Sequence, residues 1–249
     1  MMKFAKDKPF TESLKLMNYL VSVDSGFGFS SILRTCSTMF SKIGLYEDWK
    51  DSPLEYTIGK ENTNGCTTVD SFIDAMWEDE NNSQVVGIDI SYFLDELMHD
   101  ELRLFLKRLS RVQQCFIFFF RVPYLSEKAL NAFKDVLSDM VELRLISLPP
   151  LNEMQLIEYA DVRLRELGFE KISYRLYDTY IDRIRREKMD GRFYGLNTAD
   201  KVINEMVWAK MSHDMDADLS GANIVTDRIT EIDVASIHDG PVDKPTGLE

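Results

Sequence analysis

Residues 16–31, LMNYLVSVDSGFGFSS, decide the fold of this chain. The apolar run Leu16–Val23 predicts a strand, and Asp24–Gly28 predicts a glycine-containing turn. A helix is predicted from Ser30 to Ile43, because apolar residues recur there at three- and four-residue steps. A strand that passes through a tight turn into a helix is the repeating unit of parallel sheets covered by helices.

The rest of the chain continues this alternation up to Pro149-Pro150 and then becomes helical. The further predicted strands are Leu54–Ile58, Val85–Ile90, Cys115–Val122 and Glu142–Leu148. The further predicted helices are Thr68–Trp77, 93–112, Glu127–Leu137, Glu153–Leu167 with Asn152 as its N-cap, Tyr174–Lys188 and Thr198–Ser212. We therefore expect an α/β domain over 1–150, a small helical domain over 151–235 and an acidic tail over 236–249.

Composition narrows the class of protein. The 249 residues are 45% hydrophobic and 29% charged, which suits folded domains better than a disordered chain. The longest uncharged apolar stretch, Cys115–Phe120, is far too short to span a membrane, and residues 1–15 have no apolar core typical of a signal peptide. Three cysteines without a CxxC pair predict neither a disulfide framework nor a zinc site, and Cys36 and Cys115 are expected to be buried. These features predict a cytoplasmic protein with no membrane partner.

The charge balance is acidic, with 42 Asp and Glu against 29 Lys and Arg and a net charge of -13. One basic cluster stands out, and acidic neighbours within the same segment dilute it. It consists of Arg183, Arg185, Arg186, Lys188 and Arg192, interrupted by Asp182, Glu187 and Asp190. Because phosphate contacts dominate nucleic-acid affinity, we interpret this segment as a solvated helix face and expect no nucleic-acid partner.

The turn after the first strand partly matches the phosphate-binding loop G-x-x-x-x-G-K-[ST]. Gly28 and Ser30 keep the sixth and eighth places, whereas Val23 replaces the first glycine and Phe29 replaces the lysine. In such loops backbone N–H groups surround the phosphate, the lysine neutralises its charge and the hydroxyl binds Mg²⁺. Phe29 removes the only cation of the loop, and we expect its ring to point at the phosphate path.

Asp89 is the second candidate residue, because it ends the buried run VVGIDI. Ligands of open α/β sheets gather at the carboxyl ends of the strands, where Asp89 could hold a Mg²⁺-bound water. The alternative is that Asp89 caps the helix that follows.

Taken in order, six segments resemble AAA+ ATPase modules of the group that contains stage V sporulation protein K and red-type Rubisco activases. They are SVDSGFGFSS (22–31), GIDISYFL (87–94), FFFRVPYLSEKAL (118–130), LPPLNEMQLIEYADVRLRELGF (148–169), GRFYGLNTADKVINEM (191–206) and RITEIDV (228–234). The resemblance implies a P-loop NTPase fold with a five-stranded parallel sheet flanked by helices, followed by a helical lid domain. It also implies an oligomer and an ATP or ADP site with Mg²⁺. The nucleotide-binding positions would be Ser25, Gly26, Phe27, Gly28, Phe29, Ser30, Ser31 and Asn197, and the metal ligands Ser30 and Asp89.

The departures from the family pattern fall on its catalytic positions. Phe29 replaces the Walker A lysine and Ile90 replaces the Walker B glutamate. No arginine finger stands at Met140–Val141, and Asn197 aligns with the lid arginine. Because phosphoryl transfer depends on positioned charge, with an arginine finger alone contributing about 10³–10⁵ in rate, we expect no catalytic residue and no hydrolysis.

Two functions follow from the resemblance. The first is a degenerate, non-hydrolysing AAA+-fold protein that acts as an adaptor or regulatory subunit beside an intact AAA+ ATPase. The alternative is an active AAA+ ATPase that remodels a protein client, with Arg121 supplying the missing cation. Against that alternative, the stem of Arg121 could simply cover apolar surface while its head reaches water.

Overall fold

A computed structural model of the chain describes residues 17–45, 49–62, 65–78, 83–111, 116–169, 174–189, 191, 193–220 and 228–230. The chain divides into two compact units, Met1–Pro150 and Leu151–Glu249, and each is described by itself. The acidic tail expected over 236–249 and Cys115 lie outside the described residues.

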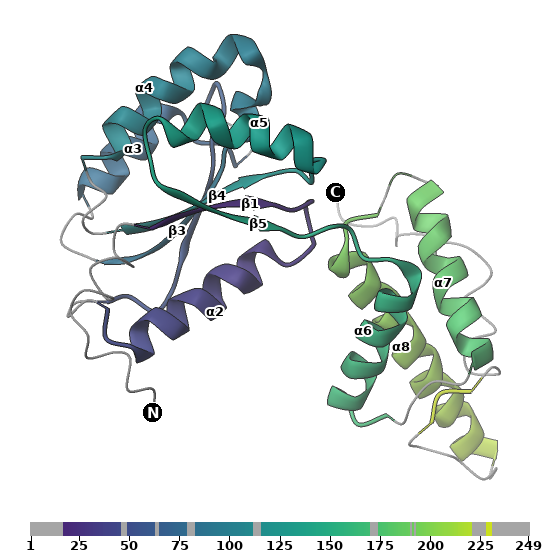
Figure 1. Cartoon of the computed structure of the whole chain (residues 1–249). Coiled ribbons are helices and arrows are strands. Elements are labelled where there is room, and N and C mark those ends of the chain that lie inside the picture. Colours follow the sequence, from purple (N-terminus) through teal and green to yellow (C-terminus); the bar gives the residue numbers. More distant parts are fainter. Residues whose placement is uncertain are drawn as a thin grey trace, which may run out of the picture. The chain divides into compact units, whose positions relative to one another are not determined.

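The first unit is a five-stranded sheet in the order β2-β3-β4-β1-β5, with all pairs parallel. The strands are β1 (Asn18–Ser22), β2 (Leu54–Thr57), β3 (Gln84–Asp89), β4 (Phe116–Val122) and β5 (Leu143–Ser147). One face is covered by α2 (Phe29–Lys42), and the other by α3 (Val69–Glu78), α4 (His99–Leu109) and α5 (Glu127–Ser138) (Figure 1). The predicted parallel five-stranded sheet flanked by helices is confirmed.

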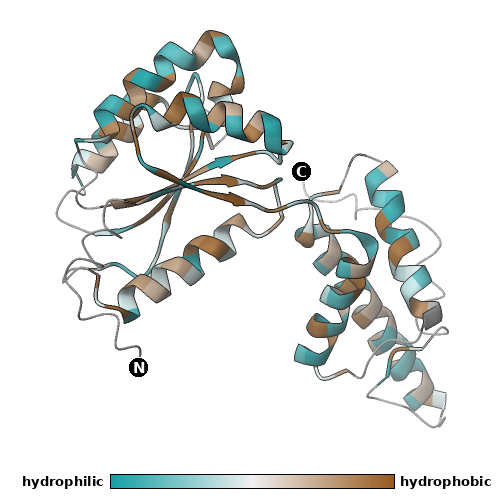
Figure 2. Cartoon of the chain, in the orientation of Figure 1, coloured by the Kyte–Doolittle hydropathy of each residue, from teal (hydrophilic) through white to brown (hydrophobic). Residues whose placement is uncertain are grey.

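The two faces of the sheet carry separate apolar cores because neighbouring side chains of a strand point to opposite sides. In β4 this alternation places Phe116, Phe118 and Phe120 on the α3–α5 face, and Ile117 and Phe119 on the α2 face. All five side chains are buried, and the central strands are correspondingly apolar in Figure 2. The aromatic run is therefore sheet core.

The predicted helix over 93–112 is wrong at its start. Two short 3-10 helices, Ser91–Leu94 and Glu96–Met98, precede α4. Asp95 interrupts them with an extended backbone, and its carboxylate accepts a hydrogen bond from the Leu97 N–H at 3.0 Å. This local cap competes with continuous helix, which is why the apolar period alone misplaced the boundary.

The second unit consists of three helices, α6 (Glu153–Glu166), α7 (Tyr174–Met189) and α8 (Leu196–Ser220), which enclose one apolar core. Asn152 caps α6 as predicted. Its side chain accepts from the Gln155 N–H at 2.9 Å, while the Gln155 side chain accepts from the Asn152 N–H at 3.0 Å. Helix α8 extends eight residues beyond the predicted end at Ser212. Ile229, in the predicted closing segment, packs into the same core.

Candidate functional site

The turn between β1 and α2 lies at the carboxyl edge of the sheet, as the sequence predicts. Gly26 and Gly28 have φ angles of 81° and 91°, a left-handed conformation that glycine adopts without strain. Gly28 is the N-cap of α2 and offers no side chain to the first N–H groups of the helix. The Asp24 carboxylate accepts a hydrogen bond from the Tyr124 N–H at 2.9 Å, which ties the turn to the segment after β4.

Phe29 does not point at a phosphate path, which corrects the sequence-based expectation. A Cβ placed on Gly87 of β3 would lie 2.9 Å from the Phe29 ring and 2.4 Å from the Leu33 side chain. The ring therefore lies against the backbone of the sheet, in the apolar layer beneath α2. Gly87 is what allows this close approach. Phe29 has become a packing residue at the place of the missing lysine.

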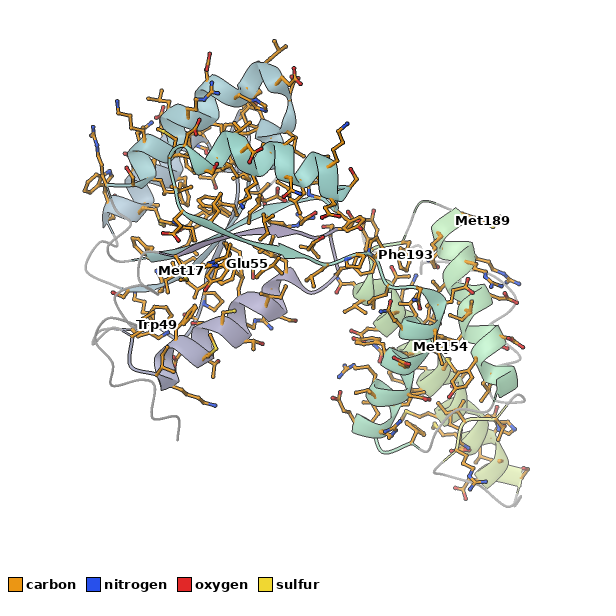
Figure 3. All side chains as sticks on the ribbon, in the orientation of Figure 1. Met17, Trp49, Glu55, Met154, Met189 and Phe193 are labelled. Carbon is orange, nitrogen blue, oxygen red and sulfur yellow. The ribbon has the colours of Figure 1, made fainter. Side chains whose placement is uncertain are left out.

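Ser30 directs its hydroxyl to a carboxylate. Its Oγ donates a hydrogen bond to Glu55 Oε2 at 2.8 Å, and Glu55 projects from β2 (Figure 3). The other loop hydroxyls, of Ser25 and Ser31, are exposed and carry no charge that could replace the lysine. The anionic Glu55 beside the start of α2 disfavours a phosphate there. The sequence analysis missed Glu55, because nothing in the spacing pairs it with Ser30.

Asp89 ends β3 with both carboxylate oxygens engaged. Oδ1 accepts from the Ser91 N–H at 3.0 Å and from the Ser91 hydroxyl at 2.5 Å, while Oδ2 accepts from Arg121 Nη1. Arg121 stands opposite Asp89 on β4, and its Nε donates to the Val23 carbonyl at 3.2 Å. The side chains of Arg121 and Asp89 are only 14% and 15% exposed.

Arg121 has neither of the two roles considered from the sequence, which were to supply the missing cation or to cover apolar surface with its stem. Arg121 neither covers apolar surface with a free head nor reaches toward an incoming ligand, because its guanidinium neutralises Asp89 and binds the end of β1. Asp89 also performs part of the predicted capping, since it holds the N–H that opens the 3-10 helix at Ser91. The available signal was that both charged residues end neighbouring buried strands.

The remaining positions give no catalytic group. Ile90 is fully buried in the core, so no carboxylate stands beside Asp89 at the Walker B glutamate position. Val141 is buried and Met140 is apolar, so the expected arginine finger has no substitute there, and Arg144 lies exposed within β5. Asn197 lies exposed near the start of α8 in the second unit, whereas all other predicted site residues belong to the first unit.

The residues of the site do not fit Mg²⁺-nucleotide. The Arg121 guanidinium already supplies a positive charge to the Asp89 carboxylate, and this like charge disfavours a Mg²⁺ ion at the same position. No group of three or more potential metal ligands occurs within the described residues. The loop itself carries an apolar ring in place of a cation. What remains of a phosphate site is backbone N–H at the start of α2.

Three cations of the predicted basic cluster contact partners within the second unit, and Arg192 lies outside the described residues. Arg183 contacts Glu187 at 2.5 Å and Glu205 at 3.2 Å. Arg185 contacts Glu153 and Asp182, both at 2.8 Å. Lys188 lies over the Phe193 ring at 4.7 Å from its centre. These cations are thus held by partners of the same unit instead of forming a bare basic face.

Neither a protein-family model nor a curated protein matches the chain. Solved structures do resemble it at low identity. A replication initiator DnaA bound to AMPPCP and single-stranded DNA is 14% identical, with a TM-score of 0.42, over 80% of this chain and 58% of that one. The Aeropyrum pernix ORC1 protein in complex with DNA is 13% identical, with a TM-score of 0.46, over 92% and 62%. Drosophila ORC bound to DNA is 10% identical, with a TM-score of 0.36, over 81% and 51%.

The fold is a parallel five-stranded sheet flanked by helices, as predicted for a P-loop NTPase. The order and direction of the strands, the β1–α2 turn and the aspartate that ends β3 place the expected elements in the expected sequence. The chain spans between about half and two thirds of the three structures just compared.

The prediction of no nucleic-acid partner, which was made from charge, is wrong. All three structures just compared are complexes with DNA. The dilution of one basic cluster by acidic neighbours was a poor criterion, because phosphate contacts are also made by backbone N–H groups and helix N-termini. On the membrane question, the described helices include none with the length and apolarity to cross a bilayer.

Proposed function

We propose that this chain is a degenerate AAA+-fold protein that does not hydrolyse ATP and acts as an adaptor or regulatory subunit of an ATPase assembly. The observation that carries the proposal is the Arg121–Asp89–Ser91 arrangement. The carboxylate that would otherwise hold a Mg²⁺-bound water is paired with a cation of the chain itself, Arg121. The proposal also keeps the resemblance to the stage V sporulation protein K and Rubisco activase group, and a cytoplasmic location.

Three further features support the absence of turnover. The loop cation is replaced by a ring packed on Gly87, the glutamate position is the buried Ile90, and Glu55 holds the Ser30 hydroxyl. In an active site the lysine stabilises charge on the transferred phosphoryl group, the glutamate polarises the attacking water and the hydroxyl holds Mg²⁺. Together they leave the chain with a scaffold but without positioned charge, which suits a structural or regulatory role.

The direct test measures phosphate release and nucleotide binding with the full chain in the presence of Mg²⁺. We expect a hydrolysis rate equal to that of buffer and no saturable binding of a fluorescent ATP analogue. A rate above background that Asp89→Asn abolishes would contradict the proposal and establish the active ATPase.

A gain-of-binding variant makes the test sharper. Phe29→Lys with Arg121→Asn restores the loop cation and frees Asp89 from its internal partner, so this double variant should bind the analogue measurably. Phe29→Lys alone is the matched control, because it adds the cation while Asp89 stays paired. Equal binding by Phe29→Lys alone and by the double variant would show that the ion pair does not decide nucleotide affinity.

A further inference from the structure

Helix α8 carries a second apolar surface that the described residues of its own unit do not bury. The residues of α8 buried in the unit are Thr198, Ala199, Val202, Ile203, Met206 and Lys210, and none of residues 211–220 is buried. Large apolar side chains nevertheless continue along the helix. The exposed set, called here the α8 stripe, consists of Trp208, Met211, Met215 and Leu219.

The spacing of the α8 stripe places it on one face. Its members follow one another at three- and four-residue steps, and at about 100° per residue they fall within a narrow arc. The same period places Val202 and Met206 on the opposite side of the helix, which faces α6 and α7 (Figure 1). Trp208 is 68% exposed, Met215 68% and Leu219 87%. A helix with apolar residues on two opposite faces is normally covered on both.

Acidic residues flank the α8 stripe. By the helical period Asp216 and Asp218 lie on either side of Met215 and Leu219, and both are exposed. Asp214 is held by Lys210 at 2.5 Å. The last turn of α8 contains no basic residue, so these carboxylates stand near the negative end of the helix dipole, which disfavours them. A cation placed beside them would relieve this repulsion.

We infer that the α8 stripe is the docking surface for an amphipathic helix of a partner protein whose apolar face is bordered by Lys or Arg. Charge complementarity carries the choice of occupant. A second copy of this chain brings a net charge of -13, and its own residues 221–249 hold six Asp and Glu against two Lys and Arg. Both would add like charge to Asp216 and Asp218. Trp208 supplies the aromatic anchor that dominates such interfaces.

The surface is independent of the nucleotide site, since it belongs to the second unit and uses none of the loop residues. The inference therefore goes beyond the proposed function, and each of the two can be tested without the other. An adaptor role would be served by such a surface.

The probe is a labelled helical peptide of about 18 residues, or five turns, with leucines at three- and four-residue steps and lysines beside them. A second peptide replaces every lysine by glutamate. We expect the full chain to bind the lysine peptide, by fluorescence anisotropy, at least about tenfold more tightly than the glutamate peptide, and less tightly as salt is raised. Equal binding of the two peptides would overturn the inference.

Two variants locate the binding on α8. Met215→Glu with Leu219→Glu should weaken the lysine peptide about tenfold or more, because it removes the apolar contact. Asp216→Lys with Asp218→Lys should weaken it similarly, and we expect this variant to stay folded because lysine suits a helix C-terminus better than aspartate. Leu97→Glu is the control, since Leu97 is equally exposed but lies in the other unit. If Leu97→Glu weakens the peptide as much as the α8 variants, or the α8 variants leave it unchanged, the surface is not the docking site.

Two further outcomes distinguish other occupants. In a chain with Trp49→Phe and Trp77→Phe, acrylamide should quench Trp208 fully in the free protein and less in the peptide complex. Shielding of Trp208 in the free protein would show that the chain itself covers the α8 stripe. Binding to phosphatidylserine-containing vesicles would identify a membrane surface instead, and either result would overturn the inference.

Discussion

The two units of the molecule differ in how their charged side chains are paired. At the sheet edge, Asp89 and Arg121 form one nearly buried pair with a single arginine for a single carboxylate. In the helical unit, Arg183 serves both Glu187 and Glu205, while Lys201 stands 3.6 Å from Glu187 as a second cation. We therefore expect the network between the helices to tolerate the loss of a member better than the pair at the sheet edge. The Asp89–Arg121 pair lies where a nucleotide site is predicted, whereas the ion pairs of the second unit connect its helices.

The largest expected effect is on the pair at the sheet edge. Arg121→Gln leaves Asp89 nearly buried without a cation and should lower the free energy of unfolding by about 3 kcal/mol. Arg183→Gln is the matched comparison and should cost less, because Lys201 remains beside Glu187. Urea unfolding followed by circular dichroism measures both. The contrast between the units would be broken if the two variants cost the same, or if adding Asp89→Asn failed to recover part of the loss.

The next largest change in stability is expected from the packing of Phe29 on the sheet. Gly87→Ala places a methyl group against Phe29 and Leu33 and should cost about 1–3 kcal/mol through overpacking. Phe29→Ala in the same chain should reduce that penalty, which a double-mutant cycle reports as coupling. Additive costs would show that the Phe29 ring does not lie where the sheet requires it.

The helical unit should lose stability at acid pH. Burial raises the pKa of Glu187, but the hydrogen bond and the charge of Arg183 outweigh it, so the pKa is lowered overall. A lowered folded-state pKa contributes stability above the unfolded value of about 4.3 that disappears as the pH falls through the folded value. Glu187→Gln should therefore flatten the acid side of the stability profile of this unit. An unchanged profile would show that Glu187 is not the linked group.

The smallest expected effect is a loss of stability at alkaline pH. Burial, followed by the hydrogen bond to Asp200, raises the pKa of Tyr159 to about 12. Stability from a raised pKa is complete below the unfolded value of about 10 and is lost as the pH rises toward 12. Burial also raises the pKa of Tyr180. Absorbance at the tyrosinate band should therefore show late-titrating groups, of which Tyr159→Phe removes the one near pH 12. Tyr194, which is 61% exposed, is the control, and its replacement should leave the late step in place.

The sequence by itself determined the elements of this protein whose signals are local. Continuous apolar runs determined the central strands β3 and β4, because parallel strands buried on both faces must be almost entirely apolar. Asn152 and Gln155 determined where α6 begins, since a capping box acts within four residues. Gly26 and Gly28 determined the turn after β1 through their left-handed backbone. The identity of the missing groups at Phe29 and Ile90 was also visible in the chain alone.

Only the tertiary structure decided what replaced those groups. Arg121 and Asp89 are 32 residues apart, and they meet because β3 and β4 lie side by side in register. Phe29 turns to the sheet because Gly87, on another strand, leaves room for its ring. The α8 stripe became visible once Val202 and Met206 were seen to occupy the other face. Each of these depends on contacts between distant segments, and side-chain spacing along one chain does not encode which distant neighbour arrives.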